Sequence, residues 1–138
     1  MCGIGNTIGN FILPLFIFPR ARFYDTMIKG GPPGCIGYEN SPKSGWMTGP
    51  LFLKVLEHIK KLLRCSKEEP ILLLMDIHES HCILDAINYC CENGIRVLTF
   101  PPHCAHRMQP LDVAVNGLSS KNCPSLRMIG LYEIQEKQ

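Results

Sequence analysis

Apolar and charged positions alternate with a helical period in the middle of the chain. After Thr48, apolar side chains recur every three or four positions, which predicts an amphipathic helix. Thr48 suits the N-cap of this helix, and Pro50 suits its first turn. The apolar face carries Phe52, Val55, Leu56, Ile59, Leu62 and Leu63. Lys54, Lys61 and Arg64 fall on the opposite face, and a charged face of this kind is most often solvated.

Two continuous apolar runs, residues 71–75 and 95–100, have the length of strands buried on both faces of a sheet. Residues 80–93 between them predict a second helix, which ends at Gly94. The expected inner face of this helix carries Ile83, Leu84, Ile87 and Cys91. Strand, helix and strand at this spacing form a βαβ unit, so the two strands should be parallel with a right-handed crossover. The pattern therefore predicts an α/β fold.

The flanking segments have weaker patterns. Residues 10–18 predict a strand, and Pro14 within it favours an edge or bulged position. Residues 20–44 are rich in glycine and proline turn signals and predict a loop region. Residues 116–138 lack a clean period and include Pro124, so this tail is expected to be poorly ordered.

Composition narrows the class of protein. The net charge is +2 with neutral histidines, which is too balanced to demand a nucleic-acid or membrane partner on electrostatics alone. No apolar run approaches the ~18 residues of a membrane span, and no secretory signal is evident. We therefore expect an intracellular protein that is neither secreted nor bound to a membrane. Its eight cysteines are then expected to be reduced thiols rather than a disulfide scaffold.

Two carboxylates are the first candidates for chemistry. Asp76 directly follows the strand at 71–75, and Asp112 lies in the segment that follows the strand at 95–100. Ligands of α/β sheets gather at the carboxyl ends of the strands, where two carboxylates could hold a hard divalent cation. The alternatives are that Asp76 caps a turn and that Asp112 caps a helix after Pro110.

A second candidate is a set of histidines and cysteines beside these carboxylates. The set comprises His78, His81, Cys82, His103, Cys104 and His106. Its two His-x-x-His pairs are chemically able to bind tetrahedral zinc. Their spacing matches no standard zinc finger, and capping or loop-orienting roles are the alternative.

Long motifs resemble a known family. Residues 73–81 read LLMDIHESH, which is similar to the LLLDNHxSH signature of the DDE superfamily endonucleases. Residues 101–113 read PPHCAHRMQPLDV, which resembles the PPHxSHxLQPLDV signature of the same family. Three upstream segments resemble these proteins in the same order: residues 9–20, 31–34 and 44–47. Together these segments span about residues 5–117. They resemble the pogo, Tigger and jerky type of transposase and its domesticated relatives, including centromere protein B.

This resemblance implies a truncated ribonuclease H-like fold with a mixed sheet and flanking helices at 1–117, followed by a divergent tail at 118–138. It also implies a nuclear, metal-dependent endonuclease that acts on DNA with Mg²⁺ or Mn²⁺. Asp76 and Asp112 match the second and third catalytic acids and would be metal ligands. The four histidines His78, His81, His103 and His106 would orient those ligands. The nucleic-acid contacts would include Lys54, Lys61, Arg64 and Arg107.

The departures from the family bear on activity. The family's first acid lies in an Asn-Asp-Glu-Thr segment, which has no counterpart before Gly9 in these 138 residues. The strand that carries it would lie between the strand at 10–18 and the pair at 71–75 and 95–100. We therefore expect unpaired strand edges and no DNA cleavage by this chain. The alternatives are a domesticated, non-catalytic nucleic-acid-binding or interaction protein and a small zinc-binding module.

Overall fold

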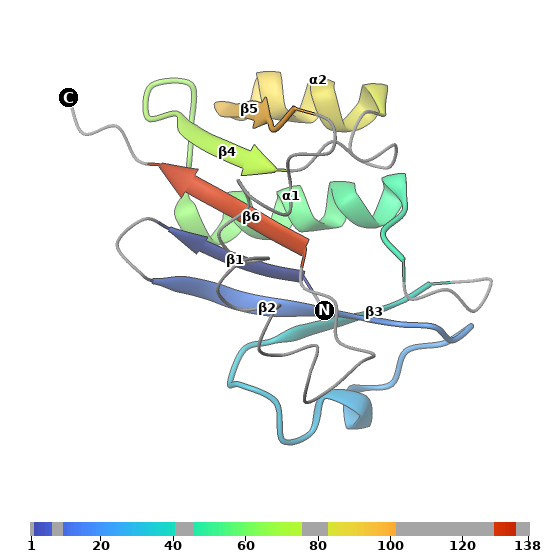
Figure 1. The fold of residues 1–138 in the computed structure, drawn as a ribbon. Helices are drawn as coiled ribbons and strands as arrows, with labels where there is room; N and C mark the ends of the chain where they lie inside the picture. Colours follow the sequence, from blue (N-terminus) through green and yellow to red (C-terminus); the bar gives the residue numbers. More distant parts are fainter. Residues whose placement is uncertain (1, 7–9, 41–45, 76–82, 102–128, 135–138) are drawn as a thin grey trace.

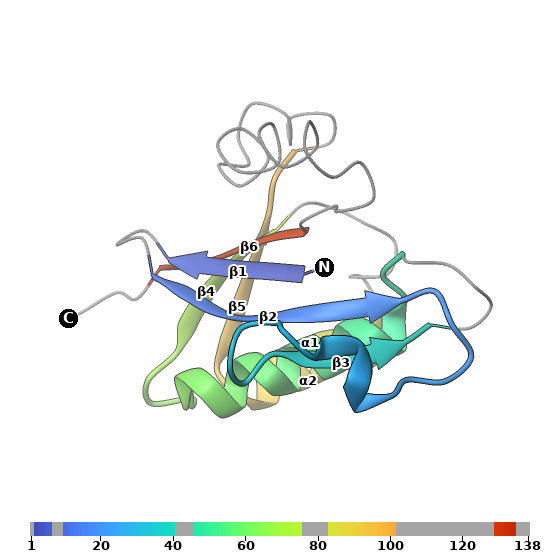
Figure 2. The ribbon, with the colours of Figure 1, turned by 90° about the horizontal axis from the view of Figure 1, so that it is seen from below.

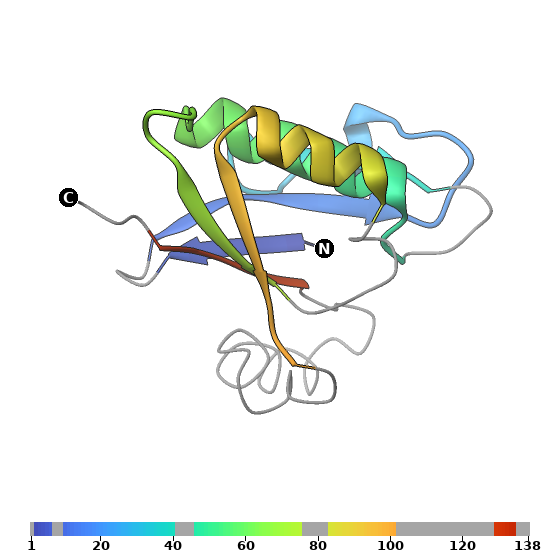
Figure 3. The same cartoon turned by 90° about the horizontal axis from the view of Figure 1, so that it is seen from above.

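The computed structural model describes residues 2–6, 10–40, 46–75, 83–101 and 129–134. These residues form a mixed α/β fold of two layers, in which both α-helices cover the same face of one sheet (Figures 2 and 3). The helices are α1 (Gly49–Leu63) and α2 (Leu84–Glu92), with a short 3₁₀ helix at Asp25–Ile28. The strands are β1 (Cys2–Asn6), β2 (Phe11–Phe18), β3 (Ile36–Glu39), β4 (Ile71–Met75), β5 (Ile95–Thr99) and β6 (Ile129–Ile134).

The sheet is mixed, as expected, with the strand order β3-β2-β1-β6-β4-β5 (Figure 1). The pairs β4–β5, β2–β3 and β1–β6 are parallel, whereas β1–β2 and β4–β6 are antiparallel. The parallel pairing of β4 with β5 confirms the βαβ unit that the sequence pattern predicts.

Strand β6 joins the two halves of the sheet. Its residues pair in parallel with β1, where Ile4 lies opposite Leu131, and antiparallel with β4, where Leu74 lies opposite Tyr132. The expectation of unpaired edges is therefore wrong for β4 and β2, because each has a neighbour on both sides. Within the tail that was expected to lack order, residues 129–134 form a strand, and the rest of the tail lies outside the described residues.

Strand β2 contains the predicted irregularity but is not an edge strand. Cys2 of β1 pairs with Leu15, and Ile4 pairs with Ile12. Between these two pairs β1 advances two residues and β2 three, so β2 has one extra residue around Pro14. A bulge of this kind accommodates the missing N–H of proline inside a sheet. The buried His58 of α1 lies 3.2 Å through Nε2 from the carbonyl oxygen of Leu13. The histidine thus ties the bulge to the helix that covers it.

The segment predicted to be a loop contains more structure than its composition indicated. Residues 20–44 include the 3₁₀ helix and β3, which pairs with β2 through Leu15–Ile36 and Phe18–Glu39. After β3, the buried Asn40 donates a hydrogen bond of 2.7 Å from Nδ2 to the carbonyl oxygen of Trp46. Pairing with a distant strand, rather than local propensity, decides that β3 forms.

Helix α1 packs on the sheet as its period predicted, except at Leu62 in the last turn, which is 40% exposed. Its inward residues are almost fully buried, with Val55, Leu56 and Ile59 at 0% exposure. They share one core with Ile4 of β1 and Leu73 of β4, so α1 bridges both halves of the sheet. Pro50 lies in the first turn, and the carbonyl of Thr48 accepts a hydrogen bond from the N–H of Phe52. The helix ends at Arg64, which adopts a left-handed conformation.

Helix α2 buries a different face from the one predicted. Ala86 and Cys90 are buried, whereas Leu84, Ile87 and Cys91 are exposed. Ala86 and Cys90 are one helical turn apart, and their small side chains suit the packing of α2 beside α1. The inward placement of Leu84, Ile87 and Cys91 is wrong because small residues match the packing surface, whereas Ile83, just before the helix, is partly buried against the core as predicted.

Strand β5 is likewise more exposed than a doubly buried strand. It lies at the end of the sheet, and Val97 and Leu98 are 39% and 55% exposed. Strand β4 behaves as predicted, since Ile71, Leu73 and Met75 are buried. The two runs look alike in sequence, but only β4 has a strand on each side.

Candidate metal site at the carboxyl edge of the sheet

The carboxyl ends of β4 and β5 lie side by side. Met75 pairs with Thr99, and the N–H of Phe100 donates a hydrogen bond of 3.0 Å to the carbonyl oxygen of Met75. Paired strands lie about 4.8 Å apart. The chain therefore leaves the sheet at neighbouring points just before the two motifs that suggested metal binding.

Asp76 is attached directly to the buried end of β4, because it follows Met75 in the chain. Asp112 belongs to the connection between β5 and β6. Since β6 is antiparallel to β4 and places Tyr132 opposite Leu74, it enters the sheet at the same carboxyl edge where β5 ends. The connection that carries Asp112 therefore leaves the sheet at this edge, after β5, and returns to it at the same edge, before β6.

The predicted site side chains themselves lie outside the described residues. These are Asp76, His78, His81, His103, His106, Arg107 and Asp112. Among the residues that the structure does describe, no three histidine, cysteine or acidic side chains form a group able to hold a metal ion. The closeness of Asp76 to Asp112 therefore stays a prediction, supported by the strand ends that carry them.

The donor chemistry of this edge suits a hard cation. Carboxylate oxygens are the ligands that Mg²⁺ and Mn²⁺ prefer, and the two candidate carboxylates would come from adjacent strand ends. The two predicted ligands, Asp76 and Asp112, are both carboxylates, which suits the divalent ion that the family resemblance implies.

Lys61 and Arg64, two of the predicted nucleic-acid contacts, do not lie at this edge. Lys61 is in the last turn of α1, and Arg64 follows it where the chain turns toward the start of β4. Strand β4 then runs about 16 Å to its carboxyl end at ~3.3 Å per residue. Figure 1 shows the C-terminal end of α1 beside the start of β4. The two basic residues and the candidate metal site therefore lie at opposite ends of the sheet.

Lys54 is engaged within the protein. Its Nζ lies 4.5 Å from the centroid of the Tyr38 ring, a cation–π contact between α1 and β3. Burial, with a smaller effect of the Glu57 carboxylate, raises the pKa of the Tyr38 hydroxyl. Lys61 and Arg64 are also exposed, but neither makes a cation–π contact with a ring among the described residues.

No disulfide bond joins the described cysteines, which are Cys2, Cys35, Cys65, Cys90 and Cys91. Burial, with smaller contributions from Cys91 and Cys65, raises the pKa of the Cys90 thiol to about 11. The neighbouring Cys91 is exposed. The two adjacent cysteines therefore differ in their access to reagents.

We expect iodoacetamide at pH 8 to alkylate Cys91 much faster than Cys90, by roughly a hundredfold or more, because the thiolate is the nucleophile and Cys90 is both buried and protonated. Fragmentation mass spectrometry of the peptide that contains both cysteines measures the two rates. In 6 M guanidinium the rates should become equal. Equal rates in the folded protein would show that α2 does not bury Cys90.

A pocket that the sequence patterns did not indicate lies between α2 and β5. Its volume is about 630 Å³, and its floor includes the buried Phe52, Ala86 and Cys90. Lys67 and Arg96 are the charged residues among its described lining. The sequence does show large apolar residues on α2 and β5. Because these residues were predicted to be buried, no exposed pocket was expected between the two elements.

In this sheet, polar segments follow the carboxyl ends of two adjacent parallel strands. This is the place where α/β proteins bind their ligands. The DDE superfamily endonuclease family matches residues 31–121, about two thirds of the 138 residues. The chain therefore belongs to the DDE superfamily endonucleases, as the motifs at 73–81 and 101–113 predicted.

A curated relative is similar over a shorter region. The chain is 40% identical over 72 residues, 51% of its length, to a protein of Cochliobolus lunatus named MFS-type transporter clz9. The matched region is about 8% of that protein. Within the described residues, neither helix is long and apolar enough to cross a membrane. No solved structure matches the chain.

Proposed function

We propose that this chain is a transposase-derived nuclease domain of the pogo, Tigger and jerky type with a ribonuclease H-like fold, acting in the nucleus on DNA. The observation that carries the proposal is the paired carboxyl ends of β4 and β5, from which the two family motifs continue. Asp76 and Asp112 are the proposed ligands of one Mg²⁺ or Mn²⁺ ion.

The roles of the residues follow from where they are attached. A ligand is most useful when its backbone is rigid, and Asp76 follows a strand whose Ile71, Leu73 and Met75 are buried. When bound, a divalent ion would polarise a phosphodiester and lower the pKa of water. The histidines of both motifs are proposed to orient the carboxylates by hydrogen bonds.

We further propose that these 138 residues bind the ion without cleaving DNA. The family's in-line displacement uses two ions, whereas the motifs at 73–81 and 101–113 supply only Asp76 and Asp112 of its acids. Two carboxylates supply too few ligands for a second ion.

The test is calorimetric titration of the purified 138-residue chain with Mn²⁺, alone and as Asp76→Asn. We expect the substitution to weaken Mn²⁺ binding by about tenfold or more, because it removes a charged ligand. Asp85→Asn is the matched control, since Asp85 is an exposed acid in the first turn of α2 and should leave the affinity unchanged.

A plasmid-nicking assay with Mg²⁺ or Mn²⁺ tests the second part of the proposal, and we expect no nicking. Metal-dependent nicking that disappears in Asp76→Asn would show that the chain cleaves DNA and that the inactive assignment is wrong. Equal Mn²⁺ affinities of Asp76→Asn and Asp85→Asn would reject Asp76 as a ligand.

A non-catalytic nucleic-acid-binding role is the second candidate. It is supported by the placement of the exposed Lys61 and Arg64 at the end of the sheet away from the candidate metal site, because a DNA contact there would not need the metal. Binding of duplex DNA that is unaffected by Asp76→Asn but weakened by Lys61→Glu would favour it. The zinc-binding alternative stays a prediction, because its histidines, Cys82 and Cys104 lie outside the described residues.

A further inference from the structure

Strand β5 is an outer edge of the sheet with open hydrogen-bonding groups. The N–H of Ile71 donates to the carbonyl oxygen of Gly94, and the N–H of Phe100 donates to that of Met75. Because the bonds of a parallel pair alternate along each strand, the backbone groups of Val97 and Thr99 point away from β4. No described strand pairs with that side of β5.

The same stretch of β5 exposes the apolar side chains of Val97 and Leu98 and lies beside a pocket. Val97 and Thr99 line the pocket of about 630 Å³ between β5 and α2. Across the pocket, Ile87 of α2 is 48% exposed, although it is a large apolar residue. An open edge beside an apolar pocket is the arrangement in which an added strand forms main-chain hydrogen bonds and places alternate side chains into the pocket.

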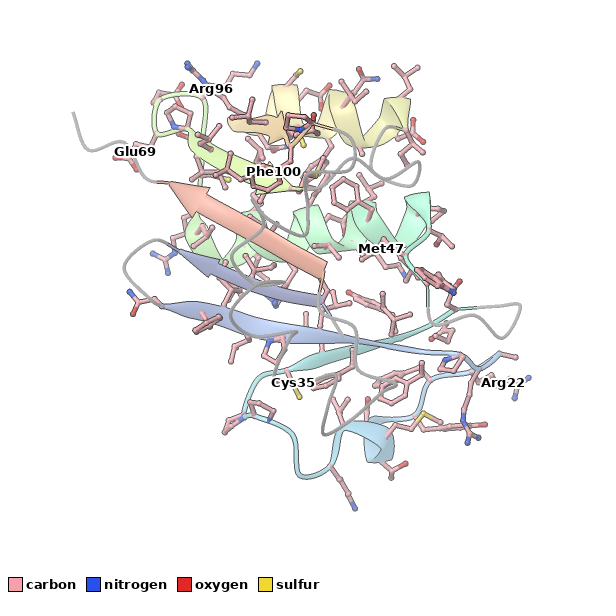
Figure 4. The ribbon with its side chains drawn as sticks, in the orientation of Figure 1. Arg22, Cys35, Met47, Glu69, Arg96 and Phe100 are labelled. Atoms are coloured by element: carbon pink, nitrogen blue, oxygen red, sulfur yellow. The ribbon has the colours of Figure 1, made fainter. Side chains whose placement is uncertain are left out.

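The charge of the pocket selects the kind of strand. Its charged residues among the described lining are Lys67 and Arg96, both cationic. Gly94 lies against the Ser66–Lys67 backbone, so Lys67 is held close to the start of β5, near Arg96. Figure 4 shows Arg96 at the outer side of the molecule, away from Phe100 at the other end of β5. Both cations therefore lie near one end of the open edge.

We propose that the edge of β5 and the α2–β5 pocket form a docking site for an extended peptide with alternating apolar residues and a terminal acidic residue. The peptide adds to β5 as a further strand, its apolar side chains contact Val97 and Ile87, and its carboxylate pairs with Arg96 and Lys67. The test measures peptide binding without any metal ion, so its failure is distinguishable from a failure of the metal-binding proposal.

The test is fluorescence anisotropy with the full 138-residue chain and three labelled peptides. The probe is fluorescein-Glu-Val-Thr-Val-Thr-Val-Glu-amide. The first control replaces both glutamates by lysine, and the second N-methylates every valine and threonine, which removes the main-chain donors of the central residues on both sides of the strand. We expect the probe to bind saturably, the lysine peptide to bind about tenfold more weakly, and the N-methylated peptide not to bind.

Two variants and a matched control locate the site. Arg96→Glu should weaken binding of the probe and strengthen binding of the lysine peptide, each by about tenfold. Ile87→Glu should weaken binding of both peptides by about tenfold. Both side chains are exposed or half-exposed, so the variants should fold, which circular dichroism checks. Lys61→Glu introduces the same charge on α1, outside the pocket lining, and should leave binding unchanged.

Three results would overturn the proposal. They are no saturable binding of the probe, equal binding of all three peptides, and equal effects of Arg96→Glu and Lys61→Glu. A fourth would reassign the surface: a concentration-dependent dimer in light scattering that Val97→Lys abolishes would mean that β5 pairs with a second copy instead of a peptide.

Discussion

Replacing Gly94 by alanine is expected to lower the free energy of unfolding by about 3 kcal/mol or more. Gly94 has a φ of 70°, and a Cβ built on it would lie 1.8 Å from the carbonyl oxygen of Ser66. It would also lie 2.3 Å from the Ser66 carbonyl carbon and 2.9 Å from the Lys67 nitrogen. These are backbone atoms, so no side-chain rotation relieves the overlap.

The surroundings of Gly94 hold both backbones in place. Its carbonyl oxygen accepts a hydrogen bond of 2.9 Å from Ile71, at the start of β4. The preceding Asn93 accepts a hydrogen bond through Oδ1 from Lys60 of α1. The turn between α1 and β4 and the turn between α2 and β5 therefore meet at one glycine, and moving either one disturbs the first ladder bond of the β4–β5 pair.

The measurement is urea unfolding followed by circular dichroism, with Gly30→Ala as the control. Gly30 has a φ of 86° but no atom within 4 Å of its added Cβ, so its substitution should cost only the conformational strain, about 1 kcal/mol. Equal losses in the two variants would show that the Ser66–Lys67 turn moves aside without cost.

Replacing Leu131 by proline is expected to be at least as damaging, with a loss of about 3 kcal/mol or more or failure to fold. Leu131 lies within β6, which pairs with β1 on one side and with β4 on the other. A proline removes a ladder donor and fits poorly in the interior of a sheet. Because β6 supplies the hydrogen bonds between the two halves, its loss leaves α1 to hold them together through the core.

The control for this variant is Val97→Pro in the edge strand β5. The N–H of Val97 points to the open side of β5, so the substitution removes no donor of the β4–β5 ladder, and we expect a loss of about 1 kcal/mol. Urea unfolding of both variants makes the comparison. An unchanged midpoint for Leu131→Pro would mean that β6 is dispensable to the sheet.

The family motifs and the local periods were readable from the sequence. The three- and four-residue recurrence at Phe52, Val55 and Ile59 defined α1 and its buried face, because a single helix packing on a flat sheet buries the side that its own pattern makes apolar. Short apolar runs around a helix defined the parallel β4–β5 pair, because the crossover rule leaves few alternatives. The motifs at 73–81 and 101–113 identified the family.

Tertiary structure alone decided which elements became neighbours. Residues 129–134 form one of the two central strands through pairing with residues 2–6, more than a hundred positions away in the chain, and no local pattern encodes such a partner. The phase of α2 was set by the fit of Ala86 and Cys90 rather than by the larger Leu84 and Ile87. For the same reason β4 and β5 look alike in sequence but differ in exposure: burial depends on what lies on each side of a strand, which only the assembled sheet defines.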